Sequence, residues 1–149
     1  MSEWANGPFR VSTDPGRLDV PLIHGFLRRS YWAEGIPEDV VRRSIRGSLC
    51  FGLFDHDRQV GFARVVTDGA TFAYLADVFV AESHRGRGLA AWLMECVMSH
   101  ADLQGLRRWA LVTRDAHGLY RKFGFEVVPQ PERHMTRDRP GLYLPREAS

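Results

Sequence analysis

Two arginines and two glycines stand together in the middle of the chain, in the stretch AESHRGRGLAAWLMECV, residues 81–97. Arg85, Gly86, Arg87 and Gly88 come directly before a run of apolar residues with helical spacing. The N-terminus of a helix carries unpaired backbone N–H groups and about half a positive charge, so it stabilises an anion. Glycine lets the backbone approach a phosphate, and arginine adds charged donors. The stretch therefore predicts a phosphate-binding loop.

Two familiar nucleotide loops fit this stretch poorly. Gly86, Gly88 and Ala91 satisfy the G-x-G-x-x-A pattern of dinucleotide folds, and Asp115 stands near the end of the next expected strand. However, the strands before the loop are expected to form hairpins, and the chain after it is too short for the second half of such a fold. A nucleoside-triphosphate loop would need Gly-Lys-Ser/Thr, which is missing. A loop without any ligand is the remaining alternative, but it leaves two helix-weakening glycines in one turn without a purpose.

The same residues also form Arg85-x-x-Gly88-x-Ala90, which resembles the R/Q-x-x-G-x-G/A signature of the GNAT superfamily of N-acetyltransferases. The segment AHGLYRKFGF, residues 116–125, is similar to a second motif of that family, A-x-x-L-Y-x-K-x-G-F. The resemblance extends over most of the chain, because the expected order of strands and helices is similar to the GNAT order. It implies transfer of an acetyl group from acetyl-CoA to a primary amine of a small molecule, by direct attack. Two alternatives stay open: a protein acetyltransferase acting on lysine or N-termini, and a non-catalytic acyl-CoA-binding module.

The resemblance also implies which residues contact acetyl-CoA, here a co-substrate. In GNAT proteins the strand before the signature splays from the next strand, the pantetheine arm lies between them, and exposed backbone groups stabilise the oxyanion. The position where many members carry asparagine is Thr113, and the common proline is replaced by Glu82. The implied contacts are Val78, Phe79, Val80, Arg85, Gly86, Arg87, Gly88, Leu89, Ala90, Thr113, His117 and Lys122.

Tyr120, in the second motif, is the candidate general acid. The resemblance aligns it with a GNAT tyrosine that commonly lies near the CoA sulfur and protonates the leaving thiolate. A phenol with a pKa of about 10 stays protonated at neutral pH and is able to donate. Packing of this side chain on a short amphipathic helix is the structural alternative, and the two roles are compatible.

Asp77 is the candidate general base, because aspartate is disfavoured in an otherwise apolar strand. If Asp68 and Gly69 form a two-residue turn, Asp77 lies opposite Val60, with Arg58 as a diagonal neighbour on the same face. An ion pair with Arg58 then explains Asp77 equally well. A carboxylate is also a weak base at neutral pH unless its surroundings favour the protonated form.

The segment SYWAEG, residues 30–35, lies between the first two expected helices, where GNAT proteins often bind the acceptor. Tyr31, Trp32 and Glu34 suit an amine, because aromatic faces attract cations and a carboxylate pairs with ammonium. The competing interpretation is a tryptophan that covers the core beneath a loop.

The elements that must position these residues indicate an α/β fold with a mixed, mostly antiparallel sheet flanked by helices. The connections DHDR and DG favour tight turns, so three successive strands should form an antiparallel meander. Asp14 and Pro15 are typical of a helix start. The expected strands are 9–12, 49–55, 59–67, 71–80, 107–113 and 125–128, with the tail 129–149 irregular or adding an edge strand near 141–145, and the expected helices begin near Pro15, Pro37, Gly86 and Asp115.

Composition and length limit the remaining possibilities. A chain of 149 residues with 44% hydrophobic and 26% charged residues predicts one globular domain, 1–149. No stretch is apolar over the ~20 residues that a membrane helix needs, and the first residues lack a signal core. Cys50 and Cys96 form no CxxC and the histidines show no metal spacing, so we expect no metal and a reducing, cytoplasmic setting. The scattered arginines predict no nucleic-acid binding. The resemblance allows a homodimer.

Overall fold

Six strands form one sheet whose spatial order follows the sequence, β1-β2-β3-β4-β5-β6. The computed structural model describes residues 1–145. Neighbouring strands are antiparallel except for β5 and β6, which are parallel. The strands are β1 Glu3–Asn6, β2 Phe9–Ser12, β3 Leu49–Asp55, β4 Arg58–Thr67, β5 Phe72–Val80 and β6 Arg108–Ala110.

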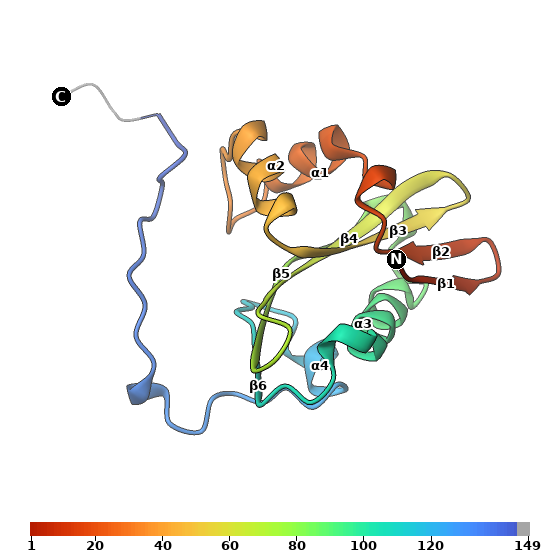
Figure 1. Cartoon of the computed structure of the whole chain (residues 1–149). Helices are drawn as coiled ribbons and strands as arrows, with labels where there is room; N and C mark the ends of the chain where they lie inside the picture. Colours follow the sequence, from red (N-terminus) through yellow and green to blue (C-terminus); the bar gives the residue numbers. More distant parts are fainter. Residues whose placement is uncertain (146–149) are drawn as a thin grey trace.

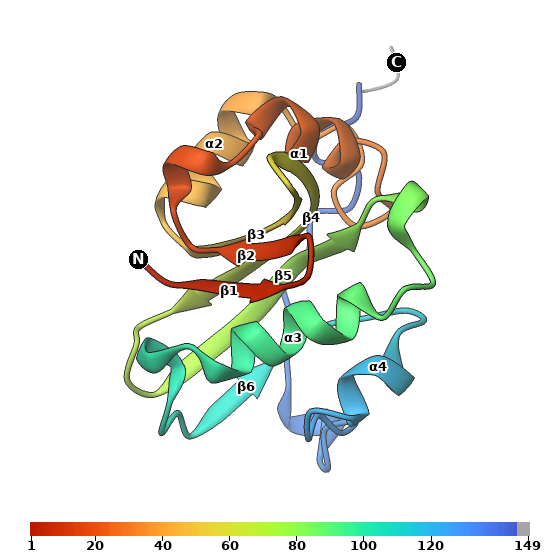
Figure 2. The same cartoon turned by 90° about the vertical axis from the view of Figure 1, so that its right-hand side faces the viewer.

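Helices cover both faces of the sheet (Figure 1). The first face carries α1 and α2 and the opposite face α3 and α4, as the view turned by 90° also shows (Figure 2). Each face encloses an apolar cluster, one built around Ile23 and Phe62 and the other around Phe51 and Leu93. The helices are α1 Val20–Leu27, α2 Glu38–Arg46, α3 Leu89–Ser99 and α4 His117–Arg121.

The expected fold class and the meander of β3, β4 and β5 are confirmed. The first helix, however, is divided in two. Asp14 accepts a hydrogen bond from the Gly16 N–H and caps a 3₁₀ turn, and Asp19 accepts one from the Leu22 N–H and caps α1. The signature helix α3 begins at Leu89 rather than at Gly86, because Gly86 and Gly88 both have left-handed φ angles.

Four expectations about strands were wrong or incomplete. The hairpin partner β1 was not anticipated, although it pairs with the whole of β2. Only Arg108–Ala110 of the expected strand 107–113 pairs with β5. Residues 125–128 and 141–145 form no strand. A strand needs a partner to satisfy its N–H and C=O groups, and neither C-terminal segment lies in the sheet.

An irregularity in β5 opens the sheet next to β6. The register between β4 and β5 shifts between Phe62 and Arg64, and on β5 the shift falls at Asp77, whose φ angle is +56°. Pairing between β5 and β6 ends at Tyr74 and Ala110. Beyond that pair the two strands separate, so the splay implied by the family resemblance is confirmed. We call the gap beyond Tyr74 the β5–β6 opening.

Gly61 on β4 tests how tightly this irregular region is packed. A Cβ added to Gly61 would lie 2.8 Å from the Leu53 Cδ2 and 2.9 Å from the Phe79 carbonyl oxygen, and a backbone oxygen cannot yield without moving β5. Gly61→Ala is therefore expected to lower the free energy of unfolding by about 1–3 kcal/mol in urea denaturation. The matched control Gly25→Ala in α1, where a Cβ meets nothing within 4 Å, should be neutral or stabilising. Equal stability of the two variants would contradict this account.

Candidate active site

The signature loop presents the start of α3 to open space. Gly86 and Gly88 have φ angles of +78° and +73°, and a Cβ on either would meet nothing within 4 Å. Glycine is therefore required by the backbone conformation and not by crowding. Gly88 caps α3 without any side-chain hydrogen bond, so no side chain caps the first N–H groups of the helix. Such a helix start fits an anionic group.

His84 fastens this loop to the sheet. Its Nε2 lies 2.9 Å from the Asp55 Oδ2 at the end of β3, and its Nδ1 lies 2.7 Å from the Ser83 hydroxyl. The hydrogen bonds from His84 and His56 hold the pKa of Asp55 below its usual value. Sequence reasoning missed this anchor, because Asp55 and His84 are 29 residues apart and nothing local connects them.

Arg85 links the loop to the end of β5. Its Nε donates to the Val80 carbonyl over 3.1 Å. The backbone N–H of the next residue, Ala81, points toward β4 and donates to the Val60 carbonyl over 2.7 Å. Because backbone groups alternate along a strand, those of Val78 and Val80 face the β5–β6 opening and those of Phe79 face β4.

The ring of Phe79 packs on the face of the sheet that α1 and α2 cover. The ring stacks on Phe26 of α1, with centroids 3.9 Å apart and planes within 10°. Phe62 lies beside it, with a centroid distance of 6.0 Å. This stacking fixes β5 against α1. The edge of β5 that faces β6 has no strand partner beyond Tyr74.

Tyr120 on α4 is 9% exposed. Burial raises the pKa of Tyr120 above its usual value, and the neighbouring Tyr31 raises it further. No buried side-chain oxygen or nitrogen among residues 1–145 lacks a hydrogen-bond partner. The Tyr120 hydroxyl makes no side-chain hydrogen bond within these residues. Since every fully buried oxygen has a partner, this hydroxyl is not fully buried and reaches accessible space.

The other residues implied for the CoA site on this side lie around α4. The Thr113 hydroxyl accepts a hydrogen bond from the Ala116 N–H over 3.0 Å, so it shapes the turn that leads into the helix. His117 and Lys122 are exposed at its two ends. The Lys122 backbone N–H donates to the Leu119 and Tyr120 carbonyls and so ends α4.

The Asp77 carboxylate accepts hydrogen bonds from two side chains. Its Oδ1 accepts from the Trp32 Nε1 over 2.9 Å, and its Oδ2 accepts from the Arg64 Nε over 2.8 Å. Arg64 in turn donates to the Ser48 hydroxyl over 3.1 Å. The expected ion pair is therefore present, but its partner is Arg64 and not Arg58. The turn after β4 is longer than two residues, since Thr67 pairs with Ala73, and this shifts the register.

The segment of residues 30–36, here called the acceptor loop, bridges the two sides of the opening. Trp32 is fixed to Asp77 on β5. Tyr31 lies under the Arg114 guanidinium at 3.9 Å, and its hydroxyl accepts from the Arg114 N–H, after β6. Tyr31 and Trp32 meet edge to face at 5.0 Å and remain 50% and 43% exposed. Glu34 is also exposed on this loop.

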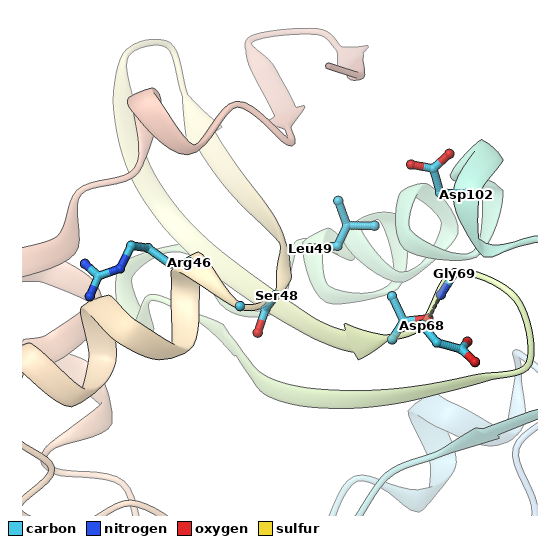
Figure 3. Close-up of a pocket in the computed structure, with 8 residues that line it drawn as sticks. Arg46, Ser48, Leu49, Asp68, Gly69 and Asp102 are labelled. Atoms are coloured by element: carbon cyan, nitrogen blue, oxygen red, sulfur yellow. Dashed lines mark hydrogen bonds between the residues drawn. The ribbon is translucent and has the colours of Figure 1, made fainter.

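A shallow pocket of about 490 Å³ lies at the other end of the sheet (Figure 3). Arg46, Ser48, Asp68 and Asp102 line it, together with the turn after β4. Hydrogen bonds from the Thr71 hydroxyl and from backbone N–H groups hold the pKa of Asp68 well below its usual value. Asp68 thus stabilises its own turn, and the pocket is separate from the signature loop.

Neither cysteine is suited to covalent catalysis. Burial raises the pKa of Cys50 and of Cys96 to about 12, so both thiols stay protonated at neutral pH. Residues 1–145 contain no cluster of three or more His, Cys, Asp or Glu side chains that would bind a metal. Within the same residues, no helix has the length and apolar character to cross a membrane.

An uncapped helix start behind a glycine loop and a parallel strand pair whose pairing ends at Tyr74 are features of the GNAT fold of acetyl-CoA-dependent acyltransferases. Comparison with known proteins agrees. The family described as "Acetyltransferase (GNAT) domain" matches residues 46–127, more than half of the chain. The chain belongs to this family of acetyltransferases, which use acetyl-CoA.

Three relatives illustrate the similarity. A crystal structure of a provisionally classed GNAT acetyltransferase from Xanthomonas campestris has a TM-score of 0.90 and 54% identity, covering 92% of this chain and 97% of that one. A Gibberella zeae protein, provisionally named an acetyltransferase, is 35% identical over 80% of this chain and 79% of its own. Serotonin N-acetyltransferase 2 of Oryza sativa is 32% identical over 91% of this chain and 70% of its own.

The ion pair at Asp77 gives a direct test of how the opening is held. Asp77→Asn leaves one acceptor oxygen for two donors, Trp32 and Arg64, in a mostly buried position. Urea denaturation should show a loss of about 3 kcal/mol in the free energy of unfolding. The control Glu38→Gln breaks an exposed pair with Arg42 and should cost at most about 0.5 kcal/mol. If Asp77→Asn costs no more than this control, the pair does not hold the opening.

Proposed function

We propose that the protein transfers the acetyl group of acetyl-CoA to the primary amine of a small molecule by direct attack. One observation carries the proposal: the Tyr120 hydroxyl reaches accessible space, and Tyr31 of the acceptor loop lies near enough to raise the pKa of Tyr120. A proton donor is thus next to the place where donor and acceptor would meet.

The signature loop is proposed to hold the pyrophosphate of acetyl-CoA. The backbone N–H groups at Leu89 and Ala90 begin α3, and Gly86 and Gly88 leave open space in front of them. Arg87 adds a positive charge on the exposed loop, while Arg85 steadies the loop on Val80. The residues present therefore fit a diphosphate, and the bound thioester would supply the activated acetyl group.

The backbone of β5 and the side chain of Tyr120 are proposed to handle the charges of the reaction. When the amine nitrogen bonds to the acetyl carbon, the Val80 N–H donates to the carbonyl oxygen, on which negative charge grows. When the carbon–sulfur bond breaks, Tyr120 gives its proton to the departing sulfur. Val78 and Val80 suit the first task, because their backbone groups face the opening.

Asp77 is proposed as the eventual acceptor of the amine proton. Both of its carboxylate oxygens already accept hydrogen bonds, from Trp32 and Arg64. Direct abstraction would compete with these bonds, so we propose that a water molecule carries the proton to Asp77. Asp77 then has a structural task and a chemical task at the same position.

A small aromatic amine is the acceptor that the acceptor loop favours. Tyr31 and Trp32 present half-exposed aromatic faces, and Glu34 adds a negative charge nearby in the sequence. The rice relative is named for serotonin, a small aromatic amine. A protein acetyltransferase and a non-catalytic acyl-CoA-binding module are the competing proposals. A panel of small aromatic amines, aliphatic amines and lysine peptides separates them.

The buried, protonated thiols support direct transfer within a ternary complex. Because both cysteines are free, a reducing, cytoplasmic setting is proposed as well. Cys50 and Cys96 are free and their raised pKa values keep them protonated, so no cysteine carries the acetyl group. Initial-rate lines should therefore intersect when both substrates are varied.

Thermal unfolding with added ligands tests the phosphate site. Acetyl-CoA at about 100 times its dissociation constant should stabilise the protein by about 2.7 kcal/mol, which raises the Tm by about 5–10 °C in a domain of this size. NAD and ATP should give no comparable shift. Gly88→Ala, which strains a φ angle of +73°, should reduce the acetyl-CoA effect. A shift produced by NAD alone, or by none of the ligands, would refute the assignment.

Tyr120→Phe tests the acid. Turnover should fall by about 10²–10⁴-fold, while the thermal shift with acetyl-CoA is retained, because only the hydroxyl is removed. The raised pKa of Tyr120 means that the protonated acid is lost only as the pH rises above 10. The wild-type rate should therefore keep this contribution through pH 9, and the variant should lack the decline above pH 10. Unchanged turnover would remove Tyr120 from the mechanism.

A further inference from the structure

Arg114 reaches the acceptor loop from the segment after β6, and both its backbone and its side chain contact Tyr31. Its backbone N–H donates to the Tyr31 hydroxyl over 3.3 Å. Its guanidinium carbon lies 3.9 Å from the centroid of the Tyr31 ring. A separation this short is typical of a guanidinium stacked on an aromatic face, which leaves the N–H groups along its edge for another partner. The side chain is thus positioned in advance while its donors stay available.

The Arg114 guanidinium has no carboxylate partner among residues 1–145. The arginines that form ion pairs there are Arg17, Arg42, Arg43 and Arg64. The hydrogen bond between Arg114 and Tyr31 uses the backbone N–H and none of the guanidinium donors. Asp115 follows directly in the chain and is exposed, but it forms no ion pair with Arg114 within these residues. A stacked arginine with an available N–H edge matches the two oxygens of a carboxylate.

Tyr31 connects this guanidinium to the proposed place of acetyl transfer. Tyr31 raises the pKa of Tyr120, so the two phenols lie near each other. Trp32, the next residue of the loop, meets Tyr31 edge to face at 5.0 Å and donates to Asp77 on β5. A small molecule that packs against Tyr31 and Trp32 is therefore close to Arg114 as well as to Tyr120.

The exposed charges of the two segments at this place are of both signs. Arg28 and Arg29 are exposed just before the acceptor loop, and Glu34 is exposed within it. Arg114 and Asp115 are the exposed charges of the segment after β6. A carboxylate pairs with an ammonium group, and an arginine pairs with a carboxylate. These segments therefore suit a molecule that carries both an amine and an acid.

We propose that the acceptor is a small aromatic amine that also carries a carboxylate, and that the Arg114 guanidinium binds this carboxylate. The inference rests on the proposed acetyl transfer and specifies its substrate class. Two N–H groups of Arg114 donate to the two carboxylate oxygens, and the aromatic part of the acceptor packs against Tyr31 and Trp32. The amine is left to attack the thioester. Arg114 thus selects the acceptor and takes no part in the bond changes.

Matched acceptors that differ only in the carboxylate test this selection. Phenylalanine is compared with phenethylamine, and para-(aminomethyl)benzoate with benzylamine, by measuring kcat/KM for acetyl transfer. The acid of at least one pair should be the better acceptor by about 10–100-fold, because it gains a charged hydrogen-bonded contact. Arg114→Gln should remove this advantage and keep kcat/KM for the plain amine within about threefold of the wild-type value.

A purely structural role of Arg114 gives a different result. If the guanidinium only braces Tyr31, Arg114→Gln lowers kcat/KM for the acid and for the plain amine by the same factor, which overturns the proposal. Equal use of acid and amine by the wild-type chain in both pairs overturns it too. The matched control is Arg58→Gln, which removes the same charge from an exposed position at the start of β4. This control should keep the preference for the acid.

Calorimetric binding separates the carboxylate site from the question of acetyl transfer. Phenylpropionate has the ring and the carboxylate without an amine, and phenylpropanamide is its neutral counterpart. The wild-type chain should bind the carboxylate about tenfold or more tightly than the amide, and Arg114→Gln should bind the two alike. Equal binding by the wild-type chain, or a preference that persists in Arg114→Gln, overturns the assignment of Arg114. Absence of transfer to every amine, with the binding preference present, refutes acetyl transfer and supports the carboxylate site.

Discussion

The ion pair between Asp77 and Arg64 is the constraint on which the rest of the site depends. It lies where β5 shifts its register, at a residue with a left-handed φ angle that is costly for most side chains and better tolerated by aspartate and asparagine. The pair, with Trp32 as a second donor, offsets that cost by giving each carboxylate oxygen a hydrogen bond. With β5 turned in this way, its pairing with β6 ends at Tyr74, and the backbone of Val78 and Val80 is left facing an opening. The irregularity therefore lies three residues beyond the last pair of β5 and β6, in the part of β5 that borders the opening.

The two ends of the opening are built by different kinds of interaction. The end proposed to bind acetyl-CoA is built from backbone: a helix start, two left-handed glycines and a loop fastened by His84 and Arg85. The end proposed to bind the acceptor is built from aromatic side chains, Tyr31 and Trp32, which are held by Asp77 on β5 and by Arg114 after β6. Backbone amides bind phosphate regardless of the rest of a ligand, whereas aromatic faces and loop shape discriminate between acceptors.

This division explains what the sequence alone could and could not predict. The signature loop, the helix start at Pro37 and the meander follow from short patterns, and all were predictable to within a few residues. The first helix was predicted to begin at Pro15, where the structure has only a 3₁₀ turn, and the start of α1 at Asp19 was missed. The partner of Asp77 was not, because the length of the Asp68–Phe72 turn sets the register, and a change of register replaces Arg58 by Arg64. The loss of the strand at 125–128 depends on pairing between distant segments, for which a short pattern carries no information. Strand β1 was missed although its turn is local, since Asn6 pairs with Phe9 across Gly7 and Pro8.

The acceptor loop is held by contacts that come from outside it: Asp77 on β5, Arg114 after β6, and the carbonyl of Tyr143 against Gly35. None of these contacts involves the signature loop. A substitution at any of them would change this loop, which is proposed to bind the acceptor, while the signature loop keeps its backbone geometry. One fold can therefore keep its acetyl donor and change its acceptor, since function lies in the site grafted on the fold and not in the fold itself. In this chain the third contact comes from Tyr143, so a segment near the C-terminal end of the described residues also shapes the loop that is proposed to bind the acceptor.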